Sequence, residues 1–382
     1  MALTSAVSAA HVWAETPEVD TRPLSVTASL ARFAPHLLAL AFPLSSLTFV
    51  LTGPHRGWVA LLFVLPIITS MLFDAHGGVT TRPPAAQVAK WPFDALLLAL
   101  TLLQLTNVCL LGRMLSHAPS VFSLETIVAM IVVGSSSAYS GIVVAHELIH
   151  RPGKLWQTAG RLLLASVLYE HFFTEHVRGH HVRVGTRDDP ATARFGESFS
   201  RFYLRTVPAQ FRSAWRLESA RLGDADMAWY DARQLRNRVL HGVVIELSIA
   251  AALGLAFGAA ALVAHLLQAW WATRSLEVVN YFEHWGIERR HRRVLPAHSW
   301  DTHSRFTYFA LTGLSRHADH HAFASRPYQQ LRVWEDSPKL PTGYLAMFWL
   351  VLARNRRFQK LMTAELRRRK LGPFAPADQI EA

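Results

Sequence analysis

Long apolar runs dominate the first part of the chain and return once in its second half. They cover residues 36–52, 57–73, 94–112, 121–145 and 239–274. A helix needs roughly 20 mostly apolar residues to cross a bilayer. Four runs are near that length, and the fifth is long enough for two shorter spans joined around Gly254–Gly258. The alternative, buried helices of a large soluble protein, rarely shows so many uncharged runs. The pattern therefore predicts an all-α integral membrane protein with about six transmembrane helices.

The polar segments divide the chain without any obvious linker, so we expect a single membrane-bound domain over residues 1–382. Its expected parts are an N-terminal cytoplasmic segment (1–35), spans one to four (36–145), a cytoplasmic region (146–238), spans five and six (239–280) and a second cytoplasmic region (281–382). The apolar patch at 344–353 is too short to cross. The N-terminus lacks the basic start and long apolar stretch of a signal peptide, so none is predicted.

The distribution of positive charge predicts the orientation. The chain carries 39 Lys and Arg against 27 Asp and Glu, a net charge of +12. The links at 53–56 and 112–120 are weakly charged, whereas 151–238, 289–293 and 354–370 are rich in arginine. The positive-inside rule places these basic segments and both termini in the cytoplasm. No nucleic-acid recognition module appears, so anionic lipids or an acidic protein partner explain the charge better.

Nine of the 20 histidines gather in four short groups, all at predicted span ends or just beyond. The groups are His146 and His150; His176, His180 and His181; His284; and His317, His320 and His321. Histidines four residues apart on a helix share one face and can reach one metal ion. Nine are too many for one metal but suit two metals with four or five nitrogens each. The pattern predicts a two-metal site at the cytoplasmic membrane surface.

Acidic residues beside these histidines are expected to accept the ring N–H that faces away from the metal. They are Glu147, Glu175, Glu283 and Asp319, and Asp189 could serve the same purpose at longer range. Imidazole suits Fe, Cu, Zn and Ni, so ligand type alone does not choose the metal. Cys109 is the one cysteine in the sequence and cannot by itself hold an iron–sulfur centre or rubredoxin-type iron.

The motifs together resemble the alkane 1-monooxygenase (alkane omega-hydroxylase) family, within the membrane histidine-box di-iron superfamily of fatty-acid desaturases and hydroxylases. They are AHELIHR (145–151), the segment 169–198 with EHVRGHH leading into DDPATARFGES, EVVNYFEHWGIER (277–289), HSW (298–300), the segment 314–332 with RHADHH, and LPTGYLAMF (340–348). None of the departures from the family pattern removes a histidine of the four groups. The second apolar run, however, lacks the acidic residue expected near Thr69, which leaves the preferred chain length open.

The resemblance implies six transmembrane helices and a non-haem di-iron centre held by the nine histidines. It implies hydroxylation of the terminal methyl of medium-chain n-alkanes with O₂, in the bacterial inner membrane with the site facing the cytoplasm. Electrons would come from NAD(P)H through rubredoxin reductase and rubredoxin. Because the chain has one cysteine, rubredoxin must be a separate protein. Rubredoxins are generally acidic, so Arg290, Arg292 and Arg293 are a predicted docking surface.

Several alternatives stay open at this stage. An enzyme that hydroxylates methyl groups of alkylaromatics, or a lipid desaturase or hydroxylase, would share the fold and the iron. HELIH alone suggests a membrane zinc protease but leaves seven of the nine grouped histidines unused, and a metal transporter would place its ligands deep within the spans. For the substrate channel, the sequence suggests Trp58, Leu62 and Ile68.

Overall fold

A computed structural model describes residues 19–22, 24–84, 88–116, 123–289 and 293–376, and these ranges contain helices but no strand. Two isolated β-bridges, Val79 to Ser304 and Asp301 to Lys339, are the extended pairings among them. The α-helices are α1 (Val26–Phe33), α2 (Ala41–Thr52), α3 (Trp58–Leu62), α4 (Leu65–His76), α5 (Trp91–Leu115), α6 (Leu124–Ser136), α7 (Val144–His150), α8 (Lys154–Ala165), α9 (Phe172–Glu175), α10 (His181–Arg183), α11 (Phe199–Arg221), α12 (Arg238–Phe257), α13 (Ala259–His284), α14 (Arg305–Ala310), α15 (His317–Ala322) and α16 (Tyr344–Arg369). The all-α prediction is confirmed for the described residues.

Five helical stretches are long and apolar enough to cross a membrane. They are Val26–Thr52, Trp58–His76, Trp91–Leu115, Leu124–His150 and Arg238–Phe257. The fifth apolar run does break where the sequence predicts, at Gly258, whose φ of 86° is a left-handed conformation that favours glycine. Its second half becomes α13, which has 26 residues but carries Arg274, Glu277 and Glu283 in its later turns. The described residues thus hold five candidate spans rather than about six.

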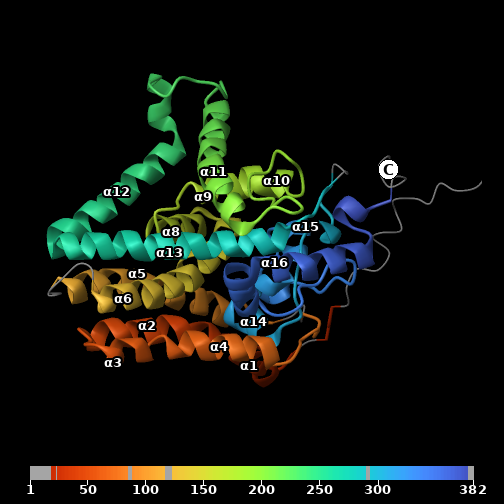
Figure 1. The fold of residues 1–382 in the computed structure, drawn as a ribbon, viewed down its shortest axis with the longest axis horizontal. Coiled ribbons are helices and arrows are strands. Elements are labelled where there is room, and N and C mark those ends of the chain that lie inside the picture. Colours follow the sequence, from red (N-terminus) through yellow and green to blue (C-terminus); the bar gives the residue numbers. More distant parts are fainter. Residues whose placement is uncertain (1–18, 23, 85–87, 117–122, 290–292, 377–382) are drawn as a thin grey trace, which may run out of the picture.

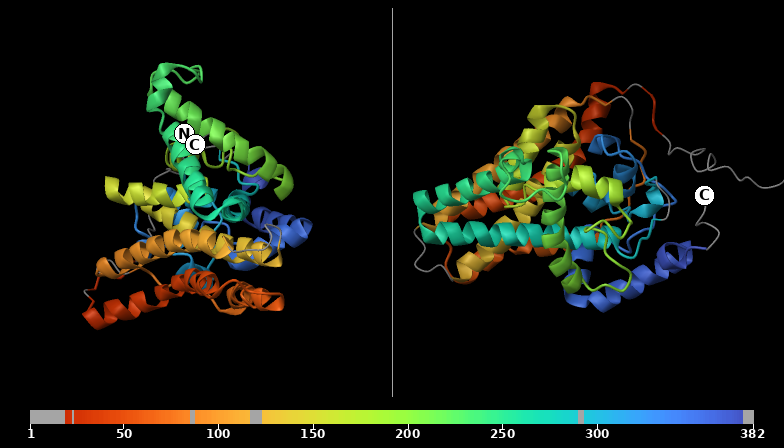
Figure 2. Two further views of the ribbon diagram at one scale, coloured as in Figure 1. Left: turned by 90° about the vertical axis from the view of Figure 1, so that its left-hand side faces the viewer. Right: turned by 90° about the horizontal axis from the view of Figure 1, so that it is seen from above.

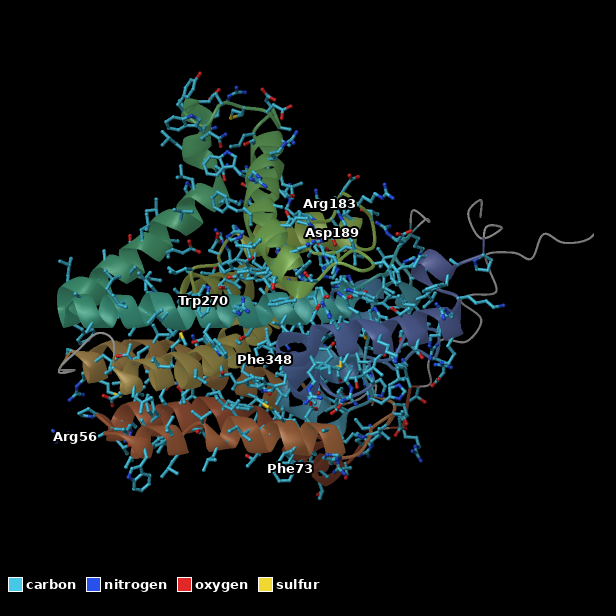
Figure 3. All side chains as sticks on the ribbon, viewed as in Figure 1. Arg56, Phe73, Arg183, Asp189, Trp270 and Phe348 are labelled. Carbon is cyan, nitrogen blue, oxygen red and sulfur yellow. The ribbon has the colours of Figure 1, made fainter. Side chains whose placement is uncertain are left out.

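The long helices form tiers that run along the long axis of the molecule (Figure 1). α2 and α4 form one outer tier, α5 and α6 the middle, and α13 lies on the other side, in contact with α5, α6 and α12. The end-on view in Figure 2 shows the same order. α11 projects away from the bundle and α12 returns obliquely to it (Figure 1). Arg56, in the link between α2 and α3, lies at the opposite end of the bundle from Arg183 and Asp189 (Figure 3).

Large apolar side chains cover the outer surface of these helices. Leu102 of α5 is 66% exposed and Leu247 of α12 is 63% exposed, although neither lies at a helix end. A soluble surface rarely carries large contiguous apolar patches, whereas a bilayer is compatible with them. Together with the five candidate spans, this surface indicates a membrane protein.

The apolar patch at 344–353, predicted to be too short to cross, forms the first turns of α16. It packs against α4 and α13, and the helix kinks at Arg354, where φ is −141° and ψ is 48°. Tyr344 and Met347 are buried in this contact. α16 therefore covers the bundle at the same end as the histidines, as Figure 1 shows for α15 and α16.

Asp74 fixes the start of α16 from within α4. Its carboxylate, 4% exposed, accepts hydrogen bonds from Ser304 Oγ and Thr307 Oγ1, both at 2.6 Å, and from the amide of Leu345 at 2.8 Å. Gly343 gives it room, because a Cβ there would come within 1.9 Å of Asp74 Oδ1. A carboxylate at a helix N-terminus satisfies otherwise unpaired amides and interacts favourably with the helix dipole.

Replacing Asp74 with alanine should lower the free energy of unfolding by about 2–4 kcal/mol, because buried hydroxyl and amide donors lose their acceptor. Thermal unfolding in detergent measures the effect. Thr69→Ala, an exposed position on the same helix, is the matched control and should change little. Equal unfolding temperatures for the two variants would show that the Asp74 contacts do not stabilise the fold.

Candidate metal centre

The nine predicted histidines converge on one region although they come from four separate segments. His146 and His150 lie on α7, His284 is the last residue of α13, and α15 carries three more. The remaining histidines belong to a π-helical turn and the start of α10. The structure thus brings all nine together, in one set of five histidines and two smaller sets of three donors that share His284, each of which could hold a metal ion.

The first group consists of His146, His150, His176, His181 and His320, with one ring nitrogen of each within 4.8 Å of the others. His181 Nε2 lies 3.1 Å from His176 Nε2 and 3.1 Å from His320 Nε2. The Nε2 atoms of His146 and His150 are buried and have no hydrogen-bond partner among the described residues. Buried ring nitrogens without a hydrogen-bond partner are rare in proteins, and metal coordination is a role that suits them.

We define the second group as the remaining histidines, His180, His284, His317 and His321, which belong to two overlapping sets of three donors that share His284. His321 Nε2 lies 2.9 Å from His317 Nε2 and 3.3 Å from His180 Nε2, and His317 Nε2 lies 3.2 Å from His284 Nε2. All four side chains are buried. Each of the four Nε2 atoms therefore lies within 3.3 Å of at least one other in the group.

The backbone at 176–180 decides which histidine joins which group. The sequence suggests that His176 and His180 act as an i, i+4 pair, but residues His176–His180 form a π-helical turn. Hydrogen bonds in a π-helix join residues five apart, which turns His181 rather than His180 towards His176. His146 and His150, four residues apart, belong to one group, and the Nε2 atoms of His317 and His321 lie 2.9 Å apart, whereas His176 and His180 fall into different groups.

The donor set fits two transition-metal ions. Nitrogens about 2.1 Å from one ion and at right angles lie about 3 Å apart, similar to the spacings within both groups. Burial, and then the neighbouring histidines, lower the pKa of His176, His181 and His320 well below the ordinary histidine value. Neutral imidazole is the form that binds metal. The lowered pKa values therefore keep these rings in the form that can bind a metal ion.

Asp189 takes the predicted role beside the second group. Its Oδ2 lies 2.9 Å from His180 Nδ1 and accepts a hydrogen bond from Thr192 Oγ1 at 2.6 Å. Burial acts to raise the pKa of Asp189, but His180 and the hydrogen bonds outweigh it, so the pKa is lowered. An ionised Asp189 would hold the His180 ring with Nε2 directed at the metal position.

Three other predicted acceptors contact arginine rather than histidine. Glu147 pairs with Arg151 at 2.9 Å, Glu175 with Arg183 at 2.7 Å and Asp319 with Arg326 at 2.5 Å. Burial raises the pKa of Glu175 to about 7, although Arg183 opposes the change. These hydrogen bonds do not match the expectation that the three residues accept ring N–H groups. Arginine provides each of these three buried carboxylates with a compensating positive charge.

Glu283 differs from these residues. It is 2% exposed, its Oε2 lies 3.3 Å from His317 Nε2, and its Oε1 accepts a hydrogen bond from Tyr344 Oη at 2.6 Å. Tyr344 was not among the residues predicted from the sequence. Its position at the start of an apolar patch gave no signal that its hydroxyl reaches a carboxylate far away in the chain.

An apolar cavity of about 180 Å³ leads to both histidine groups. His146 and His176 of the first group and His317 of the second line one end. Along one helical stretch the lining runs from Ile131 to His146, which corresponds to roughly 20 Å. Its other walls come from α4, α13 and α16 and include Ile67, Met71, Trp271, Val279, Phe348 and Trp349.

Of the three channel residues suggested by the sequence, Ile68 lines this cavity. Trp58 and Leu62 do not, and they are 70% and 46% exposed. They lie on α3, before the helix restarts at Leu65, and their side chains face outwards. The suggestion is therefore wrong for this cavity at Trp58 and Leu62.

The predicted docking arginines are only partly described. Arg290 and Arg292 lie outside the described residues, and Arg293 is exposed. The neighbouring Arg289 donates hydrogen bonds to the carbonyls of Val184 at 2.8 Å and Val182 at 2.6 Å. Its position next to the residues after His181 places the start of this basic segment close to the histidine groups.

Several known proteins are similar to this chain in sequence. The family model of fatty acid desaturases matches residues 123–351, more than half of the chain. An alkane 1-monooxygenase of Pseudomonas aeruginosa is 43% identical over 226 residues, which cover 58% of this chain and 58% of that protein. An alkane 1-monooxygenase of Alcanivorax borkumensis is 33% identical over 329 residues, 81% of this chain and 78% of that protein. The hydroxylase component of a xylene/toluene monooxygenase from Pseudomonas putida is 22% identical over 217 residues, 55% of this chain and 58% of that protein.

Proposed function

Because the chain belongs to the alkane 1-monooxygenase family, within the fatty acid desaturases, we propose that it hydroxylates the terminal methyl of medium-chain n-alkanes. In this reaction one atom of O₂ is inserted into a C–H bond. The other atom is reduced to water, which consumes two electrons and two protons. The observation that carries the proposal is an apolar cavity that ends at two groups of histidines. The first P. aeruginosa relative is matched over 58% of its length, so its named activity alone does not establish the activity here.

The five histidines of the first group would hold one iron ion, and the four histidines of the second group would hold the other. Iron bound there would supply the activation of O₂ that a terminal C–H bond requires. The protein's own contribution is to fix the positions of the histidine ligands. Asp189 orients His180, and the ion pair of Glu175 with Arg183 braces the turn that carries His176.

The cavity would orient the alkane by shape, because an alkane has no group that can form a hydrogen bond. Ile142, Val143 and Leu314 line the cavity, as do the metal-site residues His146 and His317. Apolar walls exclude water from this end and let a chain terminus approach the metal site. Ile68 and Phe348 would contact the rest of the chain.

Electrons would reach the site from NAD(P)H through rubredoxin reductase and rubredoxin. The basic segment 289–293 is the proposed contact for the acidic rubredoxin, since Arg289 lies beside the residues that follow His181. We further propose that this end faces the cytoplasm across the bacterial inner membrane. The distribution of arginine supports that orientation. The weakly charged link that contains Arg56 lies at the opposite end of the bundle from Arg183, which belongs to an arginine-rich segment (Figure 3).

Asp189→Asn should weaken iron binding by about 10–100-fold, because His180 loses the acceptor that fixes its ring. Asp188→Asn changes an exposed carboxylate one residue away and is the matched control. Iron content after dialysis against a graded series of chelator concentrations measures the effect. Equal iron retention by both variants would contradict the orienting role of Asp189.

The function is tested by supplying reconstituted protein, rubredoxin and reductase with a series of n-alkanes, an alkylbenzene and a phospholipid acyl chain. We expect O₂-dependent primary alcohol from the n-alkanes. A benzylic alcohol alone would support the xylene-type reaction, and an altered acyl chain would support a lipid desaturase or hydroxylase. Absence of primary alcohol from every alkane would overturn the proposal.

A further inference from the structure

The carboxylate of Glu283 lies among the nitrogens of the second histidine group. Oε2 is 3.3 Å from His317 Nε2, and that same nitrogen faces His284 Nε2 at 3.2 Å and His321 Nε2 at 2.9 Å. The oxygen therefore has nearly the same spacing from His317 as the other donors have. Glu283, His284 and His317 together form a set of donors within 4.8 Å of one another.

No arginine or lysine pairs with Glu283 among the ion pairs of the described residues, although it is 2% exposed. The buried Glu147, Glu175 and Asp319 each have an arginine partner. A buried carboxylate without a compensating charge is strongly unfavourable. A metal ion bound by the adjacent histidines would provide the positive charge that compensates the Glu283 carboxylate.

Tyr344 directs the carboxylate towards the histidines. Its hydroxyl donates to Glu283 Oε1 at 2.6 Å, which leaves Oε2 on the side of His317. The amide of Tyr344 in turn donates to Thr307 Oγ1 at 3.0 Å, and that hydroxyl donates to Asp74 at 2.6 Å. The position of the phenol is thus fixed through the start of α16.

We propose that Glu283 supplies an oxygen ligand to the metal ion of the second histidine group, with Tyr344 as its positioning residue. The inference rests on the proposed function for the presence of metal and adds one protein ligand to the nine histidines. The two metal positions are then chemically different, with five nitrogens at one and four nitrogens and an oxygen at the other. Carboxylate oxygen is a harder donor than imidazole, so it distinguishes the two ions. Glu283 also lines the cavity, so the anionic ligand of this ion would face the proposed alkane site.

Anaerobic titration of the metal-free protein with Fe(II) tests the ligand directly. In Glu283→Gln, we expect one of two binding events to weaken by at least about 10-fold and the other to change by less than about 2-fold. Unchanged binding at both positions, or equal weakening of both, would overturn the proposal. Size-exclusion chromatography in detergent shows whether the variant is folded.

If Glu283→Gln does not fold, Tyr344→Phe carries the test. We expect this variant to change one of two signals in the Mössbauer spectrum of protein loaded with ⁵⁷Fe. Tyr281→Phe is the matched control, because Tyr281 is also buried but donates its hydroxyl to the carbonyl of Glu197, 2.6 Å away. Identical spectra for both variants and the wild type would overturn the proposal.

Both readouts report metal binding and not product formation. Wild-type protein that binds two irons but makes no alcohol would therefore count against the proposed function alone. Two irons with unaltered binding in Glu283→Gln, together with normal alcohol formation, would count against the ligand assignment alone.

Discussion

Replacing His181 with alanine should remove one of two iron ions and lower alkane hydroxylation by at least about 100-fold. His181 Nε2 lies 3.1 Å from both His176 Nε2 and His320 Nε2, so its loss leaves the five-histidine group incomplete at its centre. Iron per chain and the rate of primary alcohol formation are the measurements. The second group shares no ligand with the first and should retain its ion.

His171→Gln is the matched control for this variant. His171 is buried and lies five residues before His176, but its ring contacts Tyr169 and Phe211 and it belongs to neither histidine group. We expect both irons to remain in it. If His181→Ala kept two irons and an unchanged rate, the five-histidine group would not be a metal site.

The substitution Ala138→Trp should abolish oxidation of long alkanes, while short alkanes remain substrates. Ala138 lines the cavity eight residues before His146, which corresponds to about 12 Å along the helix. A bulky ring there blocks the cavity beyond that distance. Misplacement of a bound chain by as little as about 1 Å can lower a rate by about 100-fold, so we expect at least that loss for dodecane and a much smaller one for hexane.

Product yields from hexane, octane, dodecane and hexadecane, compared within one preparation, measure this shift. Ile127→Trp introduces the same ring on the same helical stretch, at a position that is 52% exposed on the outside, and should keep the wild-type profile. An unchanged ratio of hexane to dodecane oxidation in Ala138→Trp would show that the alkane does not use this cavity.

The nine histidines could be identified from the sequence, because i, i+4 spacing and position after an apolar run are local patterns. Their division into two groups could not. It depends on a π-helical turn at His176–His180, and nothing in the residue pattern distinguishes that turn from an α-helix. Backbone geometry therefore makes His181 the neighbour of His176, whereas the sequence alone suggests His180.

The partners of the acidic residues depend on contacts between distant segments. Glu147 and Glu175 find arginines within eight residues, which spacing could have suggested, whereas Tyr344 reaches Glu283 from 61 residues away. For the same reason the sequence did not indicate that α16 forms part of the cavity wall. An apolar patch too short to span a membrane indicates burial but not which surface it covers.

The number of membrane spans shows what the hydropathy of the sequence cannot predict. Apolar length identified five candidate spans, and the break at Gly258 followed from the glycines at 254 and 258. α13 carries the apolar first turns of a span but ends in charged residues and His284, because its last turns serve the histidine site. A hydropathy pattern cannot separate these two roles within one helix.

The most direct test of the account is the number and type of metal ions per chain in purified protein, measured by elemental analysis with Mössbauer spectroscopy of ⁵⁷Fe-loaded protein. Two irons per chain in two distinct environments are expected. One zinc per chain, or a single iron bound by all the histidines, would contradict it.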